Sequence, residues 1–262
     1  AYNDFVTEFA SADPRRLLSI MTIPFWDVDA AVAEMERCLA AGHRGLVLGT
    51  DFPRVGLPPL GDDYWKPVLS TAQDMDLSVN FHIGFASMDA NDFRSLLRAR
   101  SPRAEFARES ALMMLGNARA ISEIIVTGVC DAYPSLKFVS VESGCGWIPF
   151  LLESLDWQWK NSGAAAENPA MLLPSEYFHR QIYGSFWFEE ESFRRAVSIV
   201  PENIMFETDF PHATSLSPGP ASFAEMPSVQ ASRAMRGLQH DLVRKVLHDT
   251  AASVYHVGGE VA

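Results

Sequence analysis

The sequence predicts an α/β fold built on a parallel sheet, and two observations lead to this class. Short β-rich segments alternate with amphipathic helical segments along the chain, which is the pattern of consecutive βαβ units. The chain also has 262 residues, and one closed (β/α)8 barrel usually needs about 250 residues. Because no internal repeat and no long linker divides the sequence, we expect a single domain over residues 1–262.

The first half of the chain holds three predicted strands and two predicted helices. The segment 17–23 is β-rich and stops at Pro24, since proline cannot continue a strand ladder. Apolar residues at helical spacing predict a helix over 29–41, and Gly42 suits the end of that helix. The alternation continues with a strand at 45–49, a helix at 65–75 and a strand at 77–83.

The second half repeats the alternation after a polar, arginine-rich stretch at 84–110, which we interpret as a long loop. The predicted helices lie at 111–133, 148–159, 190–200 and 238–255, and the predicted strands lie at 136–141, 181–188 and 204–208. A second long loop, rich in serine and proline, is predicted at 213–227. Six strands are fewer than the eight of a closed barrel, so an open doubly wound sheet is the alternative. The sequence lacks the glycine-rich motifs of nucleotide-binding sheets, which counts against that version of the alternative.

The composition argues for a small-molecule partner and against nucleic acid or membrane. The 33 acidic and 21 Lys and Arg residues give a net charge of −12, whereas nucleic acids and anionic membranes attract basic surfaces. No apolar segment reaches the roughly 20 residues that span a bilayer, and no secretory signal opens the chain. Three cysteines without a C-x-x-C pair suit a reducing compartment. We therefore expect a cytoplasmic protein with buried, unpaired cysteines.

Three predicted strands place polar side chains on one face near their carboxyl ends, because side chains alternate between the two faces of a strand. The polar pairs are Asn80 and His82, Ser140 and Glu142, and Glu207 and Asp209. The opposite faces are mostly apolar and suit packing against helices. Functional sites of parallel α/β folds lie at the carboxyl ends of the strands, so we expect the polar side chains to converge there. One imidazole and several carboxylates could hold a divalent metal or share acid–base work.

Two other features near these strands are weaker candidates. His212 lies three residues after Asp209 and either supports the metal-binding side chains, faces the substrate or belongs to a plain loop. The glycine-rich turn 143–146 could let a ligand approach the backbone. Its spacing is not that of a nucleophile elbow or a phosphate loop, so we interpret Cys145 as a buried residue rather than a nucleophile.

The motifs around Glu142 and Asp209 resemble those of the amidohydrolase-related proteins, the metal-dependent group that includes aminocarboxymuconate-semialdehyde decarboxylase. The matching segments are 12–17, 42–45, 133–138, 142–147, 207–212 and 246–255. The resemblance implies a distorted (β/α)8 barrel. It also implies that His82 binds a metal ion and that Asp209 both binds the metal and handles the reaction proton. Zinc is the expected metal with manganese as the alternative, and a homodimer is the assembly common among such relatives.

The sequence departs from the family pattern at two places. The family usually has histidine where this chain has Glu142, and its first strand ends in His-x-His, a motif that this sequence does not contain. The first recognisable segment matches a point just before the third strand of the family, and the chain begins with Ala1 rather than methionine. We therefore expect the six strands to be strands three to eight of a barrel whose first two strands are absent from this chain.

Together these observations predict a metal-dependent hydrolase of the amidohydrolase superfamily that acts on a small organic substrate, aromatic or carboxylated. Asp209 would take a proton from a metal-activated water, Glu142 would orient that water or the substrate, and His212 would contact the substrate. Non-oxidative decarboxylation of a small carboxylic acid at the same site is the alternative reaction. A non-catalytic barrel remnant or an interaction subunit is the alternative from another class.

Overall fold

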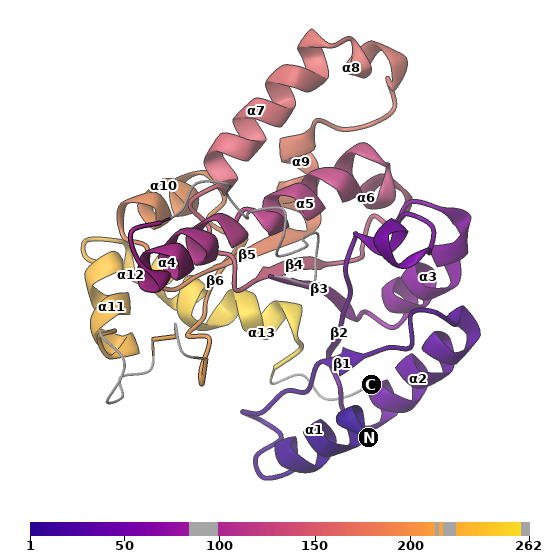
Figure 1. The fold of residues 1–262 in the computed structure, drawn as a ribbon, viewed down its shortest axis with the longest axis horizontal. Coiled ribbons are helices and arrows are strands. Elements are labelled where there is room, and N and C mark those ends of the chain that lie inside the picture. The colour runs from indigo at the N-terminus through magenta and orange to yellow at the C-terminus, as the bar shows by residue number, and fades with distance from the viewer. Residues whose placement is uncertain (84–98, 213–214, 217–223, 258–262) are drawn as a thin grey trace.

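The computed structural model describes residues 1–83, 99–212, 215–216 and 224–257, and that part of the chain contains one six-stranded sheet (Figure 1). The strands are β1 (Met21–Thr22), β2 (Gly45–Val47), β3 (Ser78–His82), β4 (Phe138–Val141), β5 (Ile182–Phe186) and β6 (Ile204–Phe206). Every neighbouring pair is parallel, and the strands lie side by side in chain order. Each strand falls within a segment predicted as a strand, which confirms the βαβ alternation.

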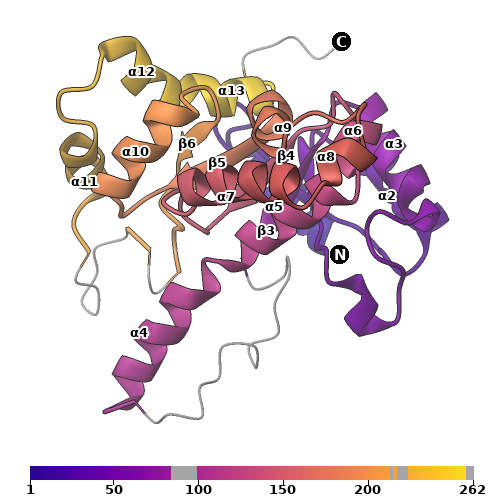
Figure 2. The same cartoon turned by 90° about the horizontal axis from the view of Figure 1, so that it is seen from above.

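Helices connect the strands and pack around the sheet (Figures 1 and 2). The longer helices are α1 (Tyr2–Ala10), α2 (Val28–Ala40), α3 (Lys66–Asp74), α4 (Pro102–Met113), α5 (Gly116–Val126), α7 (Ile148–Asn161), α9 (Pro174–Gln181), α10 (Glu191–Ile199) and α11 (Pro227–Ala234). The shorter ones are α6 (Val129–Ala132), α8 (Ala164–Glu167), α12 (His240–Arg244) and α13 (Thr250–Val254), with a π-helical turn at Lys245–Asp249 and 3₁₀ turns at Phe52–Val55 and Asp63–Trp65. Among the described residues, no helix has the length and apolar character that crossing a bilayer requires.

The loop predictions at 84–110 and 213–227 were partly wrong. Residues 102–110 belong to α4, which Figure 2 shows extending away from the body of the molecule. The Ser101 side chain accepts a hydrogen bond from the Ala104 amide at 3.2 Å, and Pro102 stands in the first turn, so local capping starts this helix despite its polar surface. Helices α1, α8, α9 and α11 were also not predicted. Residues 84–98, 213–214 and 217–223 lie outside the described residues.

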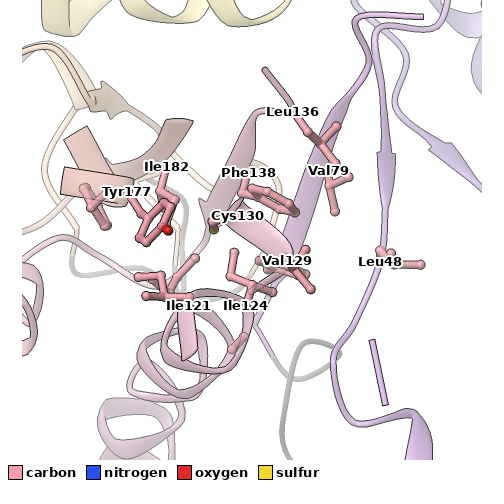
Figure 3. Packing of buried hydrophobic residues seen from close by; sticks show 14 of the residues in the cluster. Leu48, Val79, Ile121, Ile124, Val129, Cys130, Leu136, Phe138, Tyr177 and Ile182 are labelled. Atoms are coloured by element: carbon pink, nitrogen blue, oxygen red, sulfur yellow. The ribbon is translucent and has the colours of Figure 1, made fainter. Parts of the chain in front are cut away.

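The main hydrophobic core packs the sheet against its helices, and the part in Figure 3 lies between the sheet and helices α5, α6 and α9. Buried residues of α2, α3, α7 and α10 belong to the same core. Phe81 and Phe138 stack with their ring centroids 5.9 Å apart, and both are fully buried. Ile121 and Ile124 of α5 pack against this face because they lie three residues apart on one side of the helix. Cys38, Cys130 and Cys145 are all buried and unpaired, as the sequence predicted.

The other face of the sheet is covered by the C-terminal helical segment. Val139 and Met205 pack with Val254 of α13 on this face. The Tyr255 hydroxyl donates a 2.7 Å hydrogen bond to Oδ1 of the buried Asn80, which links the end of the chain to β3. This face, which would be the interior of a barrel, is therefore filled by side chains from distant parts of the sequence.

The strand order decides between the two architectures that the sequence left open. A doubly wound sheet reverses its strand order at a switch point, whereas these strands follow each other in sequence without reversal. Sequential parallel strands with helices between them are the arrangement of a (β/α)8 barrel, which has eight strands where the described residues supply six. The predicted fold class, an α/β fold of the (β/α)8 type, is confirmed, with six parallel strands among the described residues.

Candidate active site

Four of the predicted site residues meet at the carboxyl ends of β3, β4 and β6. Nε2 of His82, the last residue of β3, lies 2.8 Å from Oε2 of Glu142, which directly follows β4. Nδ1 of His212 lies 3.1 Å from Oδ2 of Asp209 and 3.8 Å from Oε1 of Glu142. The expected convergence of an imidazole with carboxylates at this edge of the sheet is thus present in the structure.

The position of the Glu142 side chain differs from the one that a strict alternation of side chains along β4 predicts. The strand register aligns Val139 with Asn80, and Val141 with His82, so these four residues share the inner face. Ser140 lies on the opposite face, where its hydroxyl accepts a hydrogen bond from Nδ2 of Asn117 on α5 at 3.0 Å. The prediction that Ser140 and Glu142 extend one polar face was therefore wrong.

The backbone at Glu142 and Asp209 explains how both carboxylates are presented. Glu142 has a φ of 58° and Asp209 has a φ of 57°, a left-handed conformation that is uncommon for residues other than glycine. Such strain is found preferentially at functional sites, where the surrounding structure enforces it. At Glu142 the backbone amide donates to Oε2 of Glu207 at 3.1 Å, and at Asp209 the carbonyl accepts from the His212 amide at 2.9 Å. These bonds hold the two turns that aim the carboxylates.

The site is electrostatically crowded with acidic groups. Burial and the nearby Glu142 raise the pKa of Asp209 to about 6, although the neighbouring His212 opposes this shift. Burial raises the pKa of Glu207 to about 7, against hydrogen bonds from the Ser185 side chain and the Glu142 amide that favour its ionised form. The hydrogen bond to Glu142 raises the pKa of His82, while partial burial works in the opposite direction. The two carboxyl groups therefore ionise closer to neutral pH than ordinary carboxyl groups do, which is a property of groups that transfer protons in active sites.

The four predicted site residues line a cavity of about 390 Å³. Its apolar wall includes side chains from α4 and the residue after it. The lining residues are His82, Ile83, Phe106, Ser110, Met113, Met114, Glu142, Trp187, Asp209 and His212. Phe106 and Ser110 were not predicted as site residues because they lie in the segment 84–110, which was interpreted as a loop, although the Ser101–Pro102 capping signal could have located the helix. Met113 lies in the predicted helix 111–133, but its sequence gave no sign that it lines the site. The size and the apolar wall suit a small aromatic molecule.

The glycine-rich turn after Glu142 is closed by the side chain of Glu189, for which the sequence predicted no role. Oε1 of the buried Glu189 accepts hydrogen bonds from the Cys145 and Gly146 amides at 2.7 and 2.9 Å. A Cβ at Gly144, where φ is 64°, would lie 2.6 Å from the same oxygen, so glycine is required there. Burial also raises the pKa of the Cys145 thiol well above its ordinary value, which agrees with its interpretation as a non-nucleophilic residue.

The donor set of the site suits a divalent cation. Glu142, Asp209 and His212 can each direct one ligand atom to a common region, with these atoms within 4.8 Å of one another. His82 borders the same region through its contact with Glu142. Carboxylate and imidazole ligands together bind ions such as Zn²⁺ and Mn²⁺, and a cation would offset the repulsion between Glu142 and Asp209. The predicted ligands His82 and Asp209 thus stand beside two more candidates, Glu142 and His212.

A family model for amidohydrolases matches residues 1–257. The chain belongs to the amidohydrolase family. This amidohydrolase is 27% identical over 218 residues to the gamma-resorcylate decarboxylase of Polaromonas sp. strain JS666, which covers 80% of this chain and 64% of that protein. It is 23% identical over 213 residues to the 2-amino-3-carboxymuconate-6-semialdehyde decarboxylase of Dictyostelium discoideum, over 80% of this chain and 55% of that protein. The family predicted from the Glu142 and Asp209 motifs is confirmed, and the chain spans less than two thirds of these relatives.

A solved structure supports the fold. The dihydroxybenzoic acid decarboxylase of Polaromonas sp. JS666, described with bound manganese and the inhibitor 2-nitroresorcinol, superimposes with a TM-score of 0.74 at 19% identity. The match covers 99% of this amidohydrolase and 75% of that chain. The described part of this chain therefore has the backbone arrangement of that enzyme, while the roles of His82, Glu142, Asp209 and His212 remain predictions.

Proposed function

We propose that this amidohydrolase is a metal-dependent decarboxylase that acts on a small aromatic carboxylic acid. The proposal is carried by the position of Asp209, a carboxyl group that lies against His212 and close to Glu142 in a 390 Å³ cavity with an apolar wall. A protonated acid beside the substrate is what decarboxylation requires, because the carbon that loses CO₂ must gain a proton. The relatives named as decarboxylases support this reaction over hydrolysis.

In the proposed reaction Asp209 is the proton donor. The bond between the ring carbon and the carboxyl carbon breaks, its electron pair stays on the ring carbon, and CO₂ leaves. The Asp209 carboxyl proton moves to that carbon, which leaves Asp209 as a carboxylate until it regains a proton from solvent. Glu142 lies against His82 and close to His212, so it would orient these two side chains and keep the local field negative, which favours a protonated Asp209.

A divalent cation would be held by Asp209 and His82, with Glu142 and His212 as further candidate ligands. When bound, the cation would supply positive charge that attracts the substrate carboxylate into an otherwise acidic cavity. Manganese is the first candidate, since the solved dihydroxybenzoic acid decarboxylase is described with manganese, and the zinc expected from the sequence is the second. The cytoplasmic location and the homodimer also remain predictions.

Hydrolysis, the first reaction that the sequence predicts, would use the same residues in a different way. Asp209 would then accept a proton from water instead of donating one to carbon. Product analysis separates the two reactions, because decarboxylation releases CO₂ and incorporates no oxygen from solvent. A non-catalytic role predicts neither product.

The test is to incubate the manganese-loaded and the zinc-loaded protein with 2,6-dihydroxybenzoate in ¹⁸O-labelled water. We expect release of CO₂ and of an unlabelled phenol, both lost in the Asp209→Asn variant. Asp63→Asn is the matched control, since Asp63 is exposed and pairs with Lys66 away from the site. Incorporation of ¹⁸O into the product of a carboxylic ester or amide, without CO₂ release from any aromatic acid, would refute decarboxylation in favour of hydrolysis.

A further inference from the structure

Asn117 is a polar residue in the apolar stripe of α5 that packs against the sheet. The buried residues of this stripe recur at helical spacing, and Ile121 and Ile124 follow Asn117 on the same side of the helix. Asn117 stands in the first turn of α5 and is fully buried. A buried amide is costly unless hydrogen bonds satisfy it, so the bonds that Asn117 makes indicate its role.

The Asn117 side-chain amide bridges the carboxyl ends of β3 and β4. Its Nδ2 lies 2.8 Å from the Phe81 carbonyl oxygen and 3.1 Å from the Val141 carbonyl oxygen, and its two N–H groups allow it to donate to both strands. Phe81 directly precedes His82, and Val141 directly precedes Glu142. The bridge therefore joins the backbone immediately before the two residues whose side chains meet at 2.8 Å.

The backbone ladder between β3 and β4 ends at the same level. Among the described residues, the last hydrogen bond between the two segments runs from the Ile83 amide to the Val141 carbonyl at 3.3 Å, which is longer than a usual N–H···O bond. Glu142 then leaves the extended conformation, with a φ of 58°. The ladder thus gives little support where His82 and Glu142 meet, and Asn117 adds a connection from a third element, α5.

Asn203 makes a similar bridge at the opposite end of the sheet. It is 1% exposed, and its Nδ2 lies within 3.2 Å of the carbonyl oxygens of Phe178, His179 and Ile182. Ile182 is the first residue of β5, and Asn203 directly precedes β6. Both asparagines therefore stabilise the fold through the same kind of bond, but of the two only Asn117 is bonded beside the candidate site.

We infer that Asn117 is a positioning residue, whose side-chain amide fixes the separation of the ends of β3 and β4 and thereby holds His82 and Glu142 together at the metal site. The inference rests on the proposed function, because it takes these two side chains to belong to a site that binds a divalent cation. A metal site requires its ligands to be held in place before the ion binds. Loss of the bridge should therefore weaken metal binding about 10- to 100-fold, the usual effect of removing a group that orients metal ligands.

The experiment compares Asn117→Ala with Asn203→Ala as the matched control. Titration calorimetry measures the binding of Mn²⁺ to the metal-free proteins, and urea unfolding measures the stability that each bridge contributes. A second comparison introduces Asn117→Ala into the His82→Ala protein. Asn117→Ser, which loses less of the side chain, takes the place of Asn117→Ala if that variant does not fold. Release of CO₂ from 2,6-dihydroxybenzoate by the Mn²⁺-loaded wild type is recorded in parallel.

We expect both asparagine variants to lose stability, but only Asn117→Ala to bind Mn²⁺ about 10- to 100-fold more weakly than the wild type. In the His82→Ala protein the same substitution should have little further effect on Mn²⁺ affinity, because the contact that the bridge holds is already lost.

Two results would show that Asn117 is only structural, while the proposed function stands. One is an equal Mn²⁺ affinity of Asn117→Ala and Asn203→Ala, and the other is an undiminished effect of Asn117→Ala in the His82→Ala protein. If the expected affinities are found but the wild type releases no CO₂, the proposed reaction is wrong and the inference stands. If the wild type does not bind Mn²⁺, the proposed metal site is wrong and the inference falls with it.

Discussion

Replacing Glu207 by glutamine should remove most of the pH dependence that this residue imposes on stability. The Glu207 carboxyl ionises with a pKa of 4.5 in its ordinary state and of about 7 in the folded protein, because the fold buries it. At a pH between these two pKa values, Glu207 has lost its proton in the unfolded chain and keeps it in the folded protein. The free energy of unfolding therefore falls as the pH rises, by about 1.4 kcal/mol for each pH unit between the two pKa values. From pH 5 to pH 8 the loss is about 2.5 kcal/mol.

Glutamine has the same shape and can still accept the hydrogen bond that the Glu142 amide donates to Glu207 at 3.1 Å. Urea unfolding of the metal-free protein at several pH values measures the effect. We expect Glu207→Gln to match the wild type near pH 5 and to exceed its free energy of unfolding by about 2 kcal/mol at pH 8. Glu153→Gln, at an exposed position on α7, should keep the wild-type slope. Equal slopes for Glu207→Gln and the wild type would refute the assignment of this buried proton.

Three other measurements follow from the site and its support. Metal analysis should find one divalent ion per chain in the wild type and a strongly reduced metal content in His82→Ala and Asp209→Asn. A full metal content in both variants would show that neither residue is a required ligand. Metal affinity should rise with pH through about 6 and above, because protons on Asp209 and on His82, whose pKa is also raised, weaken their binding to a cation. A flat affinity profile from titration calorimetry at pH 5 to 8 would contradict this. Tyr255→Phe should lower the free energy of unfolding by about 1–3 kcal/mol, because it removes the donor to the buried Asn80; an unchanged urea midpoint would contradict this.

Much of the sheet could be predicted from local sequence because each strand is short, apolar and bounded by turn residues. The same alternation placed Asn80 and His82 correctly on one face of β3, where the backbone is regular up to His82. It failed at β4, because alternation holds only while φ and ψ stay extended, and Glu142 has a φ of 58°. A left-handed glutamate gives no sequence signal, since the conformation is enforced by distant groups such as Glu207.

The parts that local sequence could not predict depend on contacts between distant segments. The Tyr255 side chain is anchored to Asn80, 175 residues earlier in the chain. The Glu189 carboxylate holds the amides of the turn at Cys145, 44 residues away. Hydrophobic periodicity describes only neighbours along one element, so it cannot register either bond. The family motifs around Glu142 and Asp209 did identify the candidate site residues, because matching a motif does not require these distant contacts to be predicted.

The candidate site concentrates unfavourable features that one ligand could relieve together. Glu142 and Asp209 adopt strained backbone conformations, and Glu142, Glu207 and Asp209 place three carboxyl groups at the ends of β4 and β6. In the metal-free protein, burial and, to a lesser extent, the neighbouring carboxylates raise the pKa values of Glu207 and Asp209, so that protons reduce the shared charge. A divalent cation offers the alternative compensation, and it can replace protons only where ligand atoms already lie close together, as they do for Glu142, Asp209 and His212. A proton and a cation thus compete for the same carboxylates. The negative charge that attracts the cation also raises the pKa values of these carboxyl groups, so the same site can hold, release and regain a proton near neutral pH.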